Sequence, residues 1–560
     1  MLDVDHDDEA PLRFRAIDTI IEPSSPPSLA ARVLSEELMF TTADEPTSFG
    51  EAERAACWRQ AMRDELRSIE ENATWELASL PAGHRAIGLK WVFKVKRDEL
   101  GNIIRHKARL VAKGYVQRAG VDFDEVFAPV ARMESIRTLL ALAAHEGWKV
   151  HHMDVKSAFL NGDLREEVYV SHPPGFIIGN DDGKVLRLRK ALYGLCQAPR
   201  AWNAKLDASM ISLGFQRSSS EHGIYTRSND ASRLVIGIYV DDLIITGASS
   251  DAINEFKQDM MRLFSMSDLG LLSYYLGIEV IQTKAGITLC QSAYAGKLLE
   301  RSGLGACNPN SLPMEPRLKL SRTSTTPTVD ATAYRRIIGG LRYLVHTRPD
   351  LAYAVGYLSR FMETPHEEHL VAVKRVLRYV VGTRHQGLYY TRREEGRARL
   401  RGFSDADMAG NIDTRKSTTG IIFFLGGNII TWQSSKQKVV ALSSCEAEYI
   451  AAAMAACQGV WLARLVKDMT GVEPGAPELK VDNQSAIALS KNPVHHDRSK
   501  HIDTRFHYIR ECIDENRIVL GHVSTEEQLA DILTKALGRV RFLELRELIG
   551  VVTIGGEGMN

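Results

Sequence analysis

The clearest pattern of apolar and polar positions lies near the middle of the chain, where Val and Ile residues surround two adjacent acids. The run Arg233-Leu-Val-Ile-Gly-Ile-Tyr-Val-Asp-Asp-Leu-Ile-Ile-Thr-Gly247 predicts a buried β-hairpin with Asp241 and Asp242 at its tip. Carboxylates in an apolar setting are costly unless they are paired or hold a cation. The pattern indicates a divalent-metal site, with a polar hairpin turn as the alternative. A third acid in a similar setting, Asp154, favours the metal site.

A second pattern predicts a basic hairpin. Between Arg85 and Arg118 the chain carries ten Lys and Arg residues against two acids. Alternating residues on both sides of a Gly-containing turn predict two strands, each with its basic residues on one face. Such a hairpin suits a polyphosphate or a nucleic-acid backbone, and the alternative is a solvated charged face.

Helical spacing marks several further segments. One helix is predicted from Glu51 through Ile69 with Ser48 as its cap, and another between a Ser135 cap and a Gly147 stop. Apolar spacing predicts more helices between residues 332 and 380. From Leu400 onward the pattern changes to strands and helices, and acids at strand ends and on helices converge from four segments, which predicts a second Mg²⁺ cluster.

Length and composition limit the class of protein. A chain of 560 residues with 44% hydrophobic and 25% charged residues predicts three or four globular domains. No apolar run is expected to span a membrane. Seven Cys residues without a C-x-x-C pair fit a reducing compartment. Because no Cys accompanies them, the pair His151-His152 and the His-rich run 492–507 are weak candidates for metal binding.

Six motifs in order resemble the reverse transcriptase of copia-type retrotransposon Pol polyproteins. They are Trp91-Val-Phe-Lys-Val-Lys, Lys107-Ala-Arg-Leu-Val-Ala-Lys-Gly, Met153-Asp-Val-Lys-Ser-Ala-Phe-Leu-Asn-Gly, Leu192-Tyr-Gly-Leu-Cys-Gln-Ala-Pro-Arg-Ala-Trp, Tyr239-Val-Asp-Asp and Tyr275-Leu-Gly-Ile-Glu. The resemblance covers roughly residues 48–540. It implies a multi-domain α+β chain: a right-hand polymerase with fingers, palm and thumb, a helical connection, and a C-terminal ribonuclease H-like α/β domain.

The expected division follows from the resemblance and from composition. Residues 1–47 are expected to be a disordered or linker segment, 48–310 the polymerase, and 311–395 a Pro/Ser/Thr linker with the helical connection. Residues 396–545 are expected to form the nuclease, and 546–560 a tail.

The resemblance also implies roles for residues of the polymerase. Asp154, Asp241 and Asp242 fall on the palm positions that hold two Mg²⁺ ions, for which Mn²⁺ is the expected substitute. Phe159 matches a steric gate against the ribose 2′-hydroxyl, with core packing as the alternative. Further expected contacts with the nucleotide or primer are Lys94, Lys107, Arg109, Tyr193, Gln197, Leu276 and Gly277, with Lys107 and Arg109 competing for the triphosphate because they share a strand face.

By motif match, the nuclease ligands are expected to be Asp405, Glu446, Asp482 and Asp531. Residues two apart on a helix point to different sides, so Glu448 is expected to lie away from the metal; Asp407 is treated as the corresponding non-ligand neighbour of Asp405. Met408 and Cys445 stand where relatives often have Trp and Thr. The His that many cellular ribonucleases H carry before the last Asp has no clear counterpart, since His522 belongs to a strand pattern.

The expected function is copying of retrotransposon RNA into DNA, with hydrolysis of the RNA strand of hybrids. The expected partners are an RNA template, a DNA primer, the RNA–DNA hybrid, dNTPs and the element's own capsid and integrase, with no membrane. The expected location is a cytoplasmic virus-like particle, with the nucleus as the alternative. Protease, integrase zinc-end and zinc-knuckle motifs are absent from the sequence, which predicts the C-terminal part of Pol alone. The competing hypotheses are a catalytically inactive nucleic-acid-binding relic and a cellular repair nuclease using residues 397–540.

Overall fold

The computed structural model describes residues 45–97, 102–176, 183–229, 232–392, 397–491 and 504–555. The predictions for the N-terminal segment and for most of the His-rich run fall outside the described residues. Two compact units are formed. The first contains the described residues up to Pro129 together with Lys156–Ser209, and the second contains Val130–Val155 and the described chain from Met210 onward.

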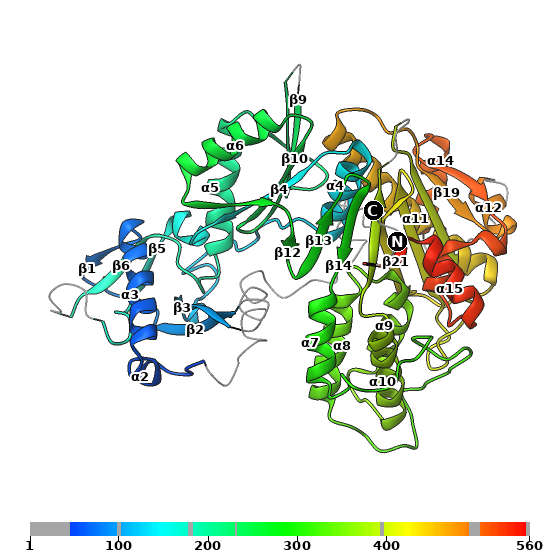
Figure 1. The fold of residues 1–560 in the computed structure, drawn as a ribbon, viewed down its shortest axis with the longest axis horizontal. Helices are drawn as coiled ribbons and strands as arrows, with labels where there is room; N and C mark the ends of the chain where they lie inside the picture. The colour runs from blue at the N-terminus through cyan, green and yellow to red at the C-terminus, as the bar shows by residue number, and fades with distance from the viewer. Residues whose placement is uncertain are drawn as a thin grey trace, which may run out of the picture. The chain divides into compact units, whose positions relative to one another are not determined.

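The first unit contains the predicted basic hairpin (Figure 1). Strands β2 (Leu89–Arg97) and β3 (Ile103–Ala112) pair antiparallel, with Lys94 opposite Lys107. Helix α3 (Ala56–Glu71) packs on β3. The first unit also contains a sheet in the order β1 (Trp75–Ala78), β6 (Val185–Lys190), β5 (Asp163–Val170). Its remaining helices are α2 (Phe49–Ala52), η2 (Gly114–Val116), η3 (Ala158–Asn161) and most of α5 (Ala198–Ser212).

Ser48 is a helix cap as predicted, but the single helix predicted after it is divided into two. The Ser48 hydroxyl accepts from the backbone N–H of Glu51 and caps the short helix α2. Helix α3 starts separately after Ala55 and has no side-chain cap. The apolar spacing located the helix but could not show the break between the two helices.

Three sheets build the second unit. A six-stranded antiparallel sheet has the order β11 (Met266–Leu271), β4 (Val150–Val155), β10 (Asp242–Gly247), β9 (Ser232–Tyr239), β8 (Ile224–Asn229), β7 (Gln216–Arg217). A five-stranded sheet has the order β12 (Tyr274–Tyr275), β13 (Ile278–Gln282), β14 (Gly286–Cys290), β15 (Gln386–Thr391), β21 (Val551–Thr553). A third has the order β18 (Asn428–Lys436), β17 (Thr418–Leu425), β16 (Leu400–Ala406), β19 (Glu478–Val481), β20 (Val519–His522). In this last sheet β18, β17 and β16 are antiparallel, and β16, β19 and β20 are parallel.

Helices connect and cover these sheets. They are α4 (Met133–Glu146), α6 (Ser250–Leu263), α7 (Ser292–Arg301), α8 (Ala331–Leu344), α9 (Ala352–Leu358), α10 (Glu367–Gly382), α11 (Ser444–Thr470), α12 (Gln484–Lys491), α14 (Tyr508–Asp514) and α15 (Arg539–Leu548). Short 3₁₀ turns are η4 (Pro349–Leu351), η5 (Ser359–Phe361), η7 (Thr504–His507), η8 (Thr525–Glu527) and η9 (Leu529–Leu533). The expected tail from residue 546 is corrected, because α15 continues to Leu548 and β21 pairs with β15.

Helix α4 lies at the centre of the second unit. Every residue from Ser135 to His145 is buried, because the helix contacts β9 of the first sheet, β14 and β15 of the second, and β17 and β18 of the third. The predicted stop at Gly147 is confirmed by its left-handed backbone, but the predicted Ser135 cap is wrong. Ser135 lies inside the helix and donates to Glu221 at 2.9 Å.

A buried arginine fixes α4 to the neighbouring elements. The guanidinium of Arg137 donates to the backbone oxygens of Ile430 on β18 at 2.8 Å and of His346 at 3.1 Å. It also lies 3.9 Å from the ring centre of Trp432. Burial lowers the pKa of Arg137 from its ordinary value, while Glu134 acts in the opposite direction. One side chain therefore joins three segments that are distant in the sequence.

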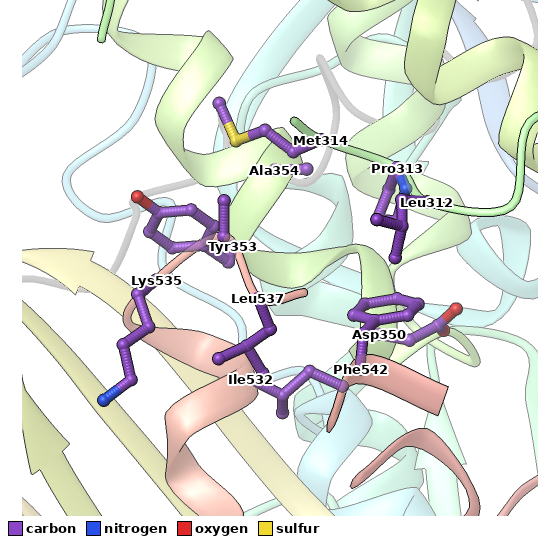
Figure 2. A pocket seen from close by; sticks show the side chains of 11 residues that line it. Leu312, Pro313, Met314, Asp350, Tyr353, Ala354, Ile532, Lys535, Leu537 and Phe542 are labelled. Atoms are coloured by element: carbon purple, nitrogen blue, oxygen red, sulfur yellow. The ribbon is translucent and has the colours of Figure 1, made fainter. Parts of the chain in front are cut away.

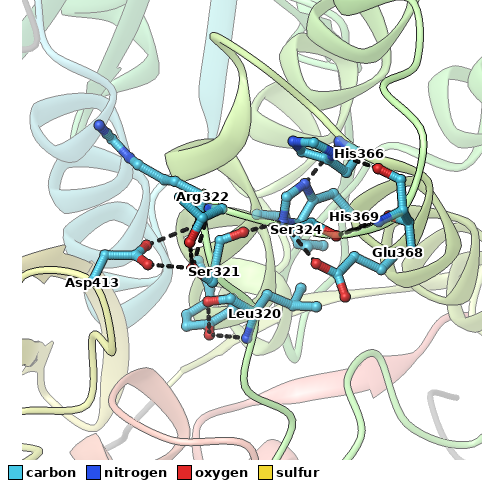
Figure 3. A network of polar contacts seen from close by, with 12 residues as sticks. Leu320, Ser321, Arg322, Ser324, His366, Glu368, His369 and Asp413 are labelled. Carbon is cyan, nitrogen blue, oxygen red and sulfur yellow. Dashed lines mark hydrogen bonds and ion pairs between the residues drawn. The ribbon is translucent and has the colours of Figure 1, made fainter.

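The segment predicted as a Pro/Ser/Thr linker has no helix or strand between α7 and α8, yet it is held in place. Asp413 accepts from the Ser321 hydroxyl at 2.5 Å and from the Arg322 N–H at 3.1 Å (Figure 3). The side chains of His369 and His366 lie 3.0 Å from the Ser321 carbonyl and 2.7 Å from the Thr326 carbonyl. These bonds fasten the segment between α10 and the loop after β16.

Helix α11 is long and apolar enough to cross a membrane by length and composition, which the sequence analysis did not anticipate. In the fold, 67% of its most apolar 18-residue window is buried. Its contacts with β16, β17 and β19 are those of a core helix.

We predict that Arg137→Met lowers the thermal unfolding midpoint of the whole chain by several degrees. The variant keeps the apolar stem but leaves two buried carbonyls without their donor, a cost of about 1 to 3 kcal/mol each. Scanning calorimetry measures the midpoint. Arg262→Met is the matched control, because Arg262 forms an exposed ion pair with Asp259 and such pairs contribute about 0 to 1 kcal/mol. Equal midpoints for the two variants would contradict the central role of Arg137.

Candidate functional site

The predicted hairpin around Asp241 and Asp242 is confirmed. Strands β9 and β10 pair so that Tyr239 lies opposite Asp242, which leaves a two-residue turn of Val240 and Asp241. Val240 has a φ of +59°. A β-branched residue with positive φ is a strained outlier, and such outliers cluster at functional sites. The strain places the two acids at the end of a buried strand pair.

The third predicted acid lies beside this turn. Asp154 on β4 is directly opposite Asp242 on β10, so the two side chains leave the sheet on the same face. The backbone N–H of Val155 donates to the carbonyl of Asp241 at 2.9 Å, which ties the turn to the end of β4. The register thus brings together three acids separated by almost ninety positions in the sequence.

Two residues hold this site: His152, which the sequence offered only as a weak metal ligand, and Tyr275, the first residue of the sixth motif. The Nε2 atom of His152 lies 2.8 Å from Oδ1 of Asp242, and the buried ring of Tyr275 packs edge-on against His152. Burial raises the pKa of Tyr275 well above its usual value, and the nearby Asp242 raises it further. His151 instead lies 3.1 Å from Nζ of Lys257, so the two histidines serve different neighbours.

In the first unit, three predicted nucleotide-contact residues form one stack. The guanidinium of Arg109 lies 3.9 Å from the ring centre of Tyr193, whose ring is 4.9 Å from that of Phe159. Phe159 is only 4% exposed, so it also contributes to packing. The other two predicted cations lie opposite each other on β2 and β3, and Lys94 forms an ion pair with Glu45 at 3.1 Å.

Gln197, also predicted to line the nucleotide pocket, is buried in a polar contact chain. Its side chain donates to the Asp122 carbonyl at 3.0 Å and accepts from Gln117 at 3.0 Å. These bonds hold the start of α5 against the loop that follows β3. In this structure Gln197 therefore positions backbone segments.

The pair Leu276-Gly277 forms the turn between β12 and β13. Both residues have positive φ, +47° and +75°. The Tyr343 hydroxyl donates to the Leu276 carbonyl, and a Cβ on Gly277 would lie 2.6 Å from that hydroxyl. The glycine is thus required by the close approach of Tyr343 as well as by the turn.

A second group of acids is denser than the first. We define the acid cluster as Asp405 on β16, Glu448 on α11 and Asp482 after β19. One ligand oxygen from each lies within 4.8 Å of the others, and among the described residues this is the group of three whose geometry suits a metal ion. All donors are hard carboxylate oxygens, which favours Mg²⁺ or Mn²⁺ over zinc.

The structure corrects the expected helix register, because Glu448 joins the acid cluster and Glu446 does not. The Glu446 carboxylate turns back and accepts from the backbone N–H of Leu442 at 2.7 Å, while Ser443 caps α11 through the Glu446 N–H. Glu448 accepts from the Ala406 N–H at 3.0 Å, beside Asp405. The rule that residues two apart diverge holds, but Glu446 faces the start of α11, where its carboxylate accepts from Leu442, the residue before the Ser443 cap.

Burial and mutual repulsion dominate the electrostatics of the acid cluster. Burial raises the pKa of Glu448 to about 10, with Asp405 and Asp482 contributing further. Burial and then Asp531 also raise the pKa of Asp482. Three carboxylates so close cannot all carry charge without a cation. The Oε2 atom of Glu448 is buried without a hydrogen-bond donor among the described residues.

The fourth predicted acid, Asp531 in η9, lies beside the cluster. Burial raises its pKa to about 6, and Asp405 adds to the effect. Lys535 pairs with Asp531 at 2.7 Å and lines the small pocket of Figure 2 together with Tyr353, Ile532 and Leu537. Sequence reasoning missed Lys535, although its place four residues after Asp531 was a usable signal.

The remaining expectations near the cluster hold or stay untested. Asp407 accepts from the N–H groups of Thr418 and Gly410 and is not part of the acid cluster. His522 ends β20. Of the His-rich run, only residues 504–507 are described, and His507 lies 2.8 Å from the Tyr449 hydroxyl.

Comparisons with known proteins give a consistent result. The family described as reverse transcriptase (RNA-dependent DNA polymerase) matches residues 72–316. The retrovirus-related Pol polyprotein from transposon TNT 1-94 of Nicotiana tabacum is 42% identical over 502 residues, which are 88% of this chain and 38% of that polyprotein. The corresponding polyprotein from transposon RE1 of Arabidopsis thaliana is 40% identical over 552 residues, 98% of this chain and 37% of that polyprotein.

A shorter relative is covered almost completely. The putative transposon Ty5-1 protein of Saccharomyces cerevisiae is 37% identical over 303 residues, 54% of this chain and 98% of that protein. The chain spans little more than a third of the length of the two plant polyproteins. With motifs and acid-bearing strands in the expected order, these matches show that the chain belongs to the copia-type retrovirus-related Pol polyproteins of transposons.

Proposed function

We propose that this chain is an RNA-directed DNA polymerase that also hydrolyses the RNA strand of RNA–DNA hybrids. The observation that carries the proposal is the register of β4 and β10, which sets Asp154 opposite Asp242 beside the strained turn at Asp241 in a chain with a reverse transcriptase match. The six-stranded sheet then corresponds to the palm of a right-hand polymerase.

The three acids suit two Mg²⁺ ions, since they present carboxylate oxygens from one face and one end of a rigid strand pair. When bound, two such ions lower the pKa of an attacking hydroxyl and neutralise a leaving pyrophosphate. The protein itself holds the acids in position. His152 orients Asp242, and the turn fixed by the Val155 N–H holds Asp241 in line with β4.

The Arg109-Tyr193-Phe159 stack is the proposed nucleotide platform. Arg109 carries the positive charge for a triphosphate, and the Tyr193 face holds that guanidinium in place. Phe159, fixed against Tyr193, is the proposed gate against a ribose 2′-hydroxyl. Lys107 extends the positive charge along the hairpin, and Lys94, which is paired with Glu45 in this structure, is a further proposed triphosphate contact. Leu276-Gly277 is the proposed primer contact.

The acid cluster is the proposed ribonuclease H centre. The strand order β18-β17-β16-β19-β20, with acids on β16, on α11, after β19 and in η9, supports this assignment. Asp405, Glu448 and Asp482 fit a divalent ion, since their like charges and the unused Glu448 oxygen call for a cation. Asp531 is the fourth proposed ligand, as expected, and Glu448 takes the place expected of Glu446.

The proposed partners are an RNA template, a DNA primer, dNTPs and the hybrid product, together with the capsid and integrase of the same element. The proposed location is a cytoplasmic virus-like particle or the nucleus. An inactive relic is the competing hypothesis. The intact acids of both centres favour an enzyme, and primer extension on RNA with Mg²⁺ beside cleavage of a labelled hybrid tests the choice.

Asp241→Asn is expected to lower the rate of primer extension about a thousandfold, because a charged ligand worth several kcal/mol is lost. Hybrid cleavage should remain. Extension on a primed RNA template measures the first activity, and Asp251→Asn, an exposed acid on α6, is the control. Extension by Asp241→Asn at the control rate would remove Asp241 from the polymerase site.

Phe159→Ala is expected to raise ribonucleotide incorporation relative to deoxyribonucleotide incorporation, because the ring that blocks the 2′-hydroxyl is gone. Single-nucleotide addition with each substrate measures the ratio. Since Phe159 is buried, Phe159→Leu serves as a second, better-packed variant and should show a smaller change in the same direction. A ratio unchanged in both variants would reduce Phe159 to a packing residue.

Glu448→Gln is expected to abolish hybrid cleavage and to leave primer extension intact, whereas Glu446→Gln should cleave. Gln can still accept the hydrogen bond from Leu442 that Glu446 makes, so the cap survives. Assays in Mg²⁺ and in Mn²⁺ separate lost chemistry from weakened metal binding. The reverse result would return the ligand role to Glu446.

A further inference from the structure

A group of basic side chains gathers at the end of the third sheet near the acid cluster. We define the cationic patch as Arg322, Arg360, Lys416 and Lys436. Lys436 lies on β18, and Lys416 lies in the loop before β17. Arg360 lies in η5 after α9, and Arg322 lies in the fastened segment of Figure 3. No motif singled out these residues, and no role in the two acid centres accounts for them.

Backbone register and hydrogen bonds hold the patch together. Lys436 on β18 lies opposite Thr418 on β17, and the Arg360 guanidinium donates to the Thr418 hydroxyl at 3.0 Å. Lys416 precedes Thr418 by two residues, and its ammonium donates to the Lys438 carbonyl at 2.5 Å. Arg322 is anchored through its N–H to Asp413, and in Figure 3 its side chain points away from that carboxylate.

Cations outnumber acids in the patch, where Asp407 acts on Arg360 and Asp413 acts on Lys436. Among the described residues, none of its four side chains forms an ion pair with a carboxylate, and Nη1 of Arg360 is buried without a hydrogen-bond acceptor. Burial lowers the pKa of Lys436, and the charges of Arg360, Arg322 and Lys416 lower it further. Grouping four cations, three of them half-buried, costs stability, and a bound polyanion would offset that cost.

The position of the patch indicates which polyanion. Asp405 on β16 pairs with Gly420, two residues along β17 from Thr418. Strands rise ~3.3 Å per residue and lie ~4.8 Å apart, so Lys436, two strands across and two residues along, lies on the order of 12 Å along the sheet from Asp405. A nucleic-acid strand whose phosphate reaches the acid cluster would pass its neighbouring phosphates over the cations.

We propose that the cationic patch binds backbone phosphates of the RNA–DNA hybrid next to the cleaved position and so sets its register in the nuclease centre. This inference rests on the proposed nuclease function. It also gives the fastened segment a role, because Asp413 holds Arg322 at the edge of the third sheet.

The test compares the Lys436→Gln, Arg322→Gln double variant with the wild-type chain. Both side chains are at least partly accessible and carry no hydrogen bond among the described residues, so folding should persist. Cleavage of a labelled hybrid should show a KM about tenfold higher with little change in kcat. The plot of log kcat/KM against log salt should be less steep by about 0.9 for each lost phosphate contact. Lys374→Gln, an exposed lysine on α10, is the matched control and should behave as wild type.

Hybrid binding in Ca²⁺, followed by fluorescence anisotropy, separates the two proposals. If the wild-type chain binds but does not cleave, the nuclease proposal fails, while weaker and less salt-dependent binding by the double variant still supports the patch. The patch proposal would be overturned if the double variant kept the KM, the salt slope and the hybrid affinity of the wild-type chain. Equal competition by a glutamate peptide of matched charge would also overturn it, since the patch would then be a protein-docking site.

Discussion

The second unit depends on the burial of α4 between three sheets. The part of α4 from Ser135 to His145 is buried, so the charged side chain of Arg137 must be satisfied internally, and it is held by two backbone carbonyls and the face of Trp432. Because Ile430 and Trp432 belong to the third sheet, the strands that carry Asp154 and the strands that carry Asp405 are anchored to one common helix. The two acid centres therefore share a single packed core.

Repulsion between neighbouring carboxylates works against this packing. The acid cluster places carboxylates where burial and mutual repulsion work against ionisation, and the raised pKa of Glu448 is the clearest result. The surrounding structure holds these acids in place through paired strands and backbone donors such as the Ala406 N–H. A bound cation would neutralise these carboxylates, and carboxylate oxygens are the ligands that the Mg²⁺ ions of the proposed chemistry prefer.

Local patterns predicted much of the fold. The basic hairpin, the hairpin at Asp241 and the helix that ends at Gly147 follow from periodicity and turn chemistry over a few residues. The errors were of one kind. Ser135 and Glu446 were each assigned by reading a cap or a helix face from spacing alone, and a shift of two or three residues changes which side chain faces the core. The segment around Ser321 looked like a linker because its bonds reach residues nearly fifty and ninety positions away.

The sequence by itself determined which residue types are present and the order of the motifs, and these were sufficient to place the chain in its family and to predict that Asp405 and Asp482 belong to one group of acids. Only the tertiary structure decided which glutamate of α11 meets Asp405, how Arg137 joins the sheets, and that Arg322, Arg360, Lys416 and Lys436 gather at one edge. The physical reason is that these features depend on pairings between distant segments. Such pairings are set by strand register and by the angle at which a helix crosses a sheet, and neither quantity is encoded in a short window of residues.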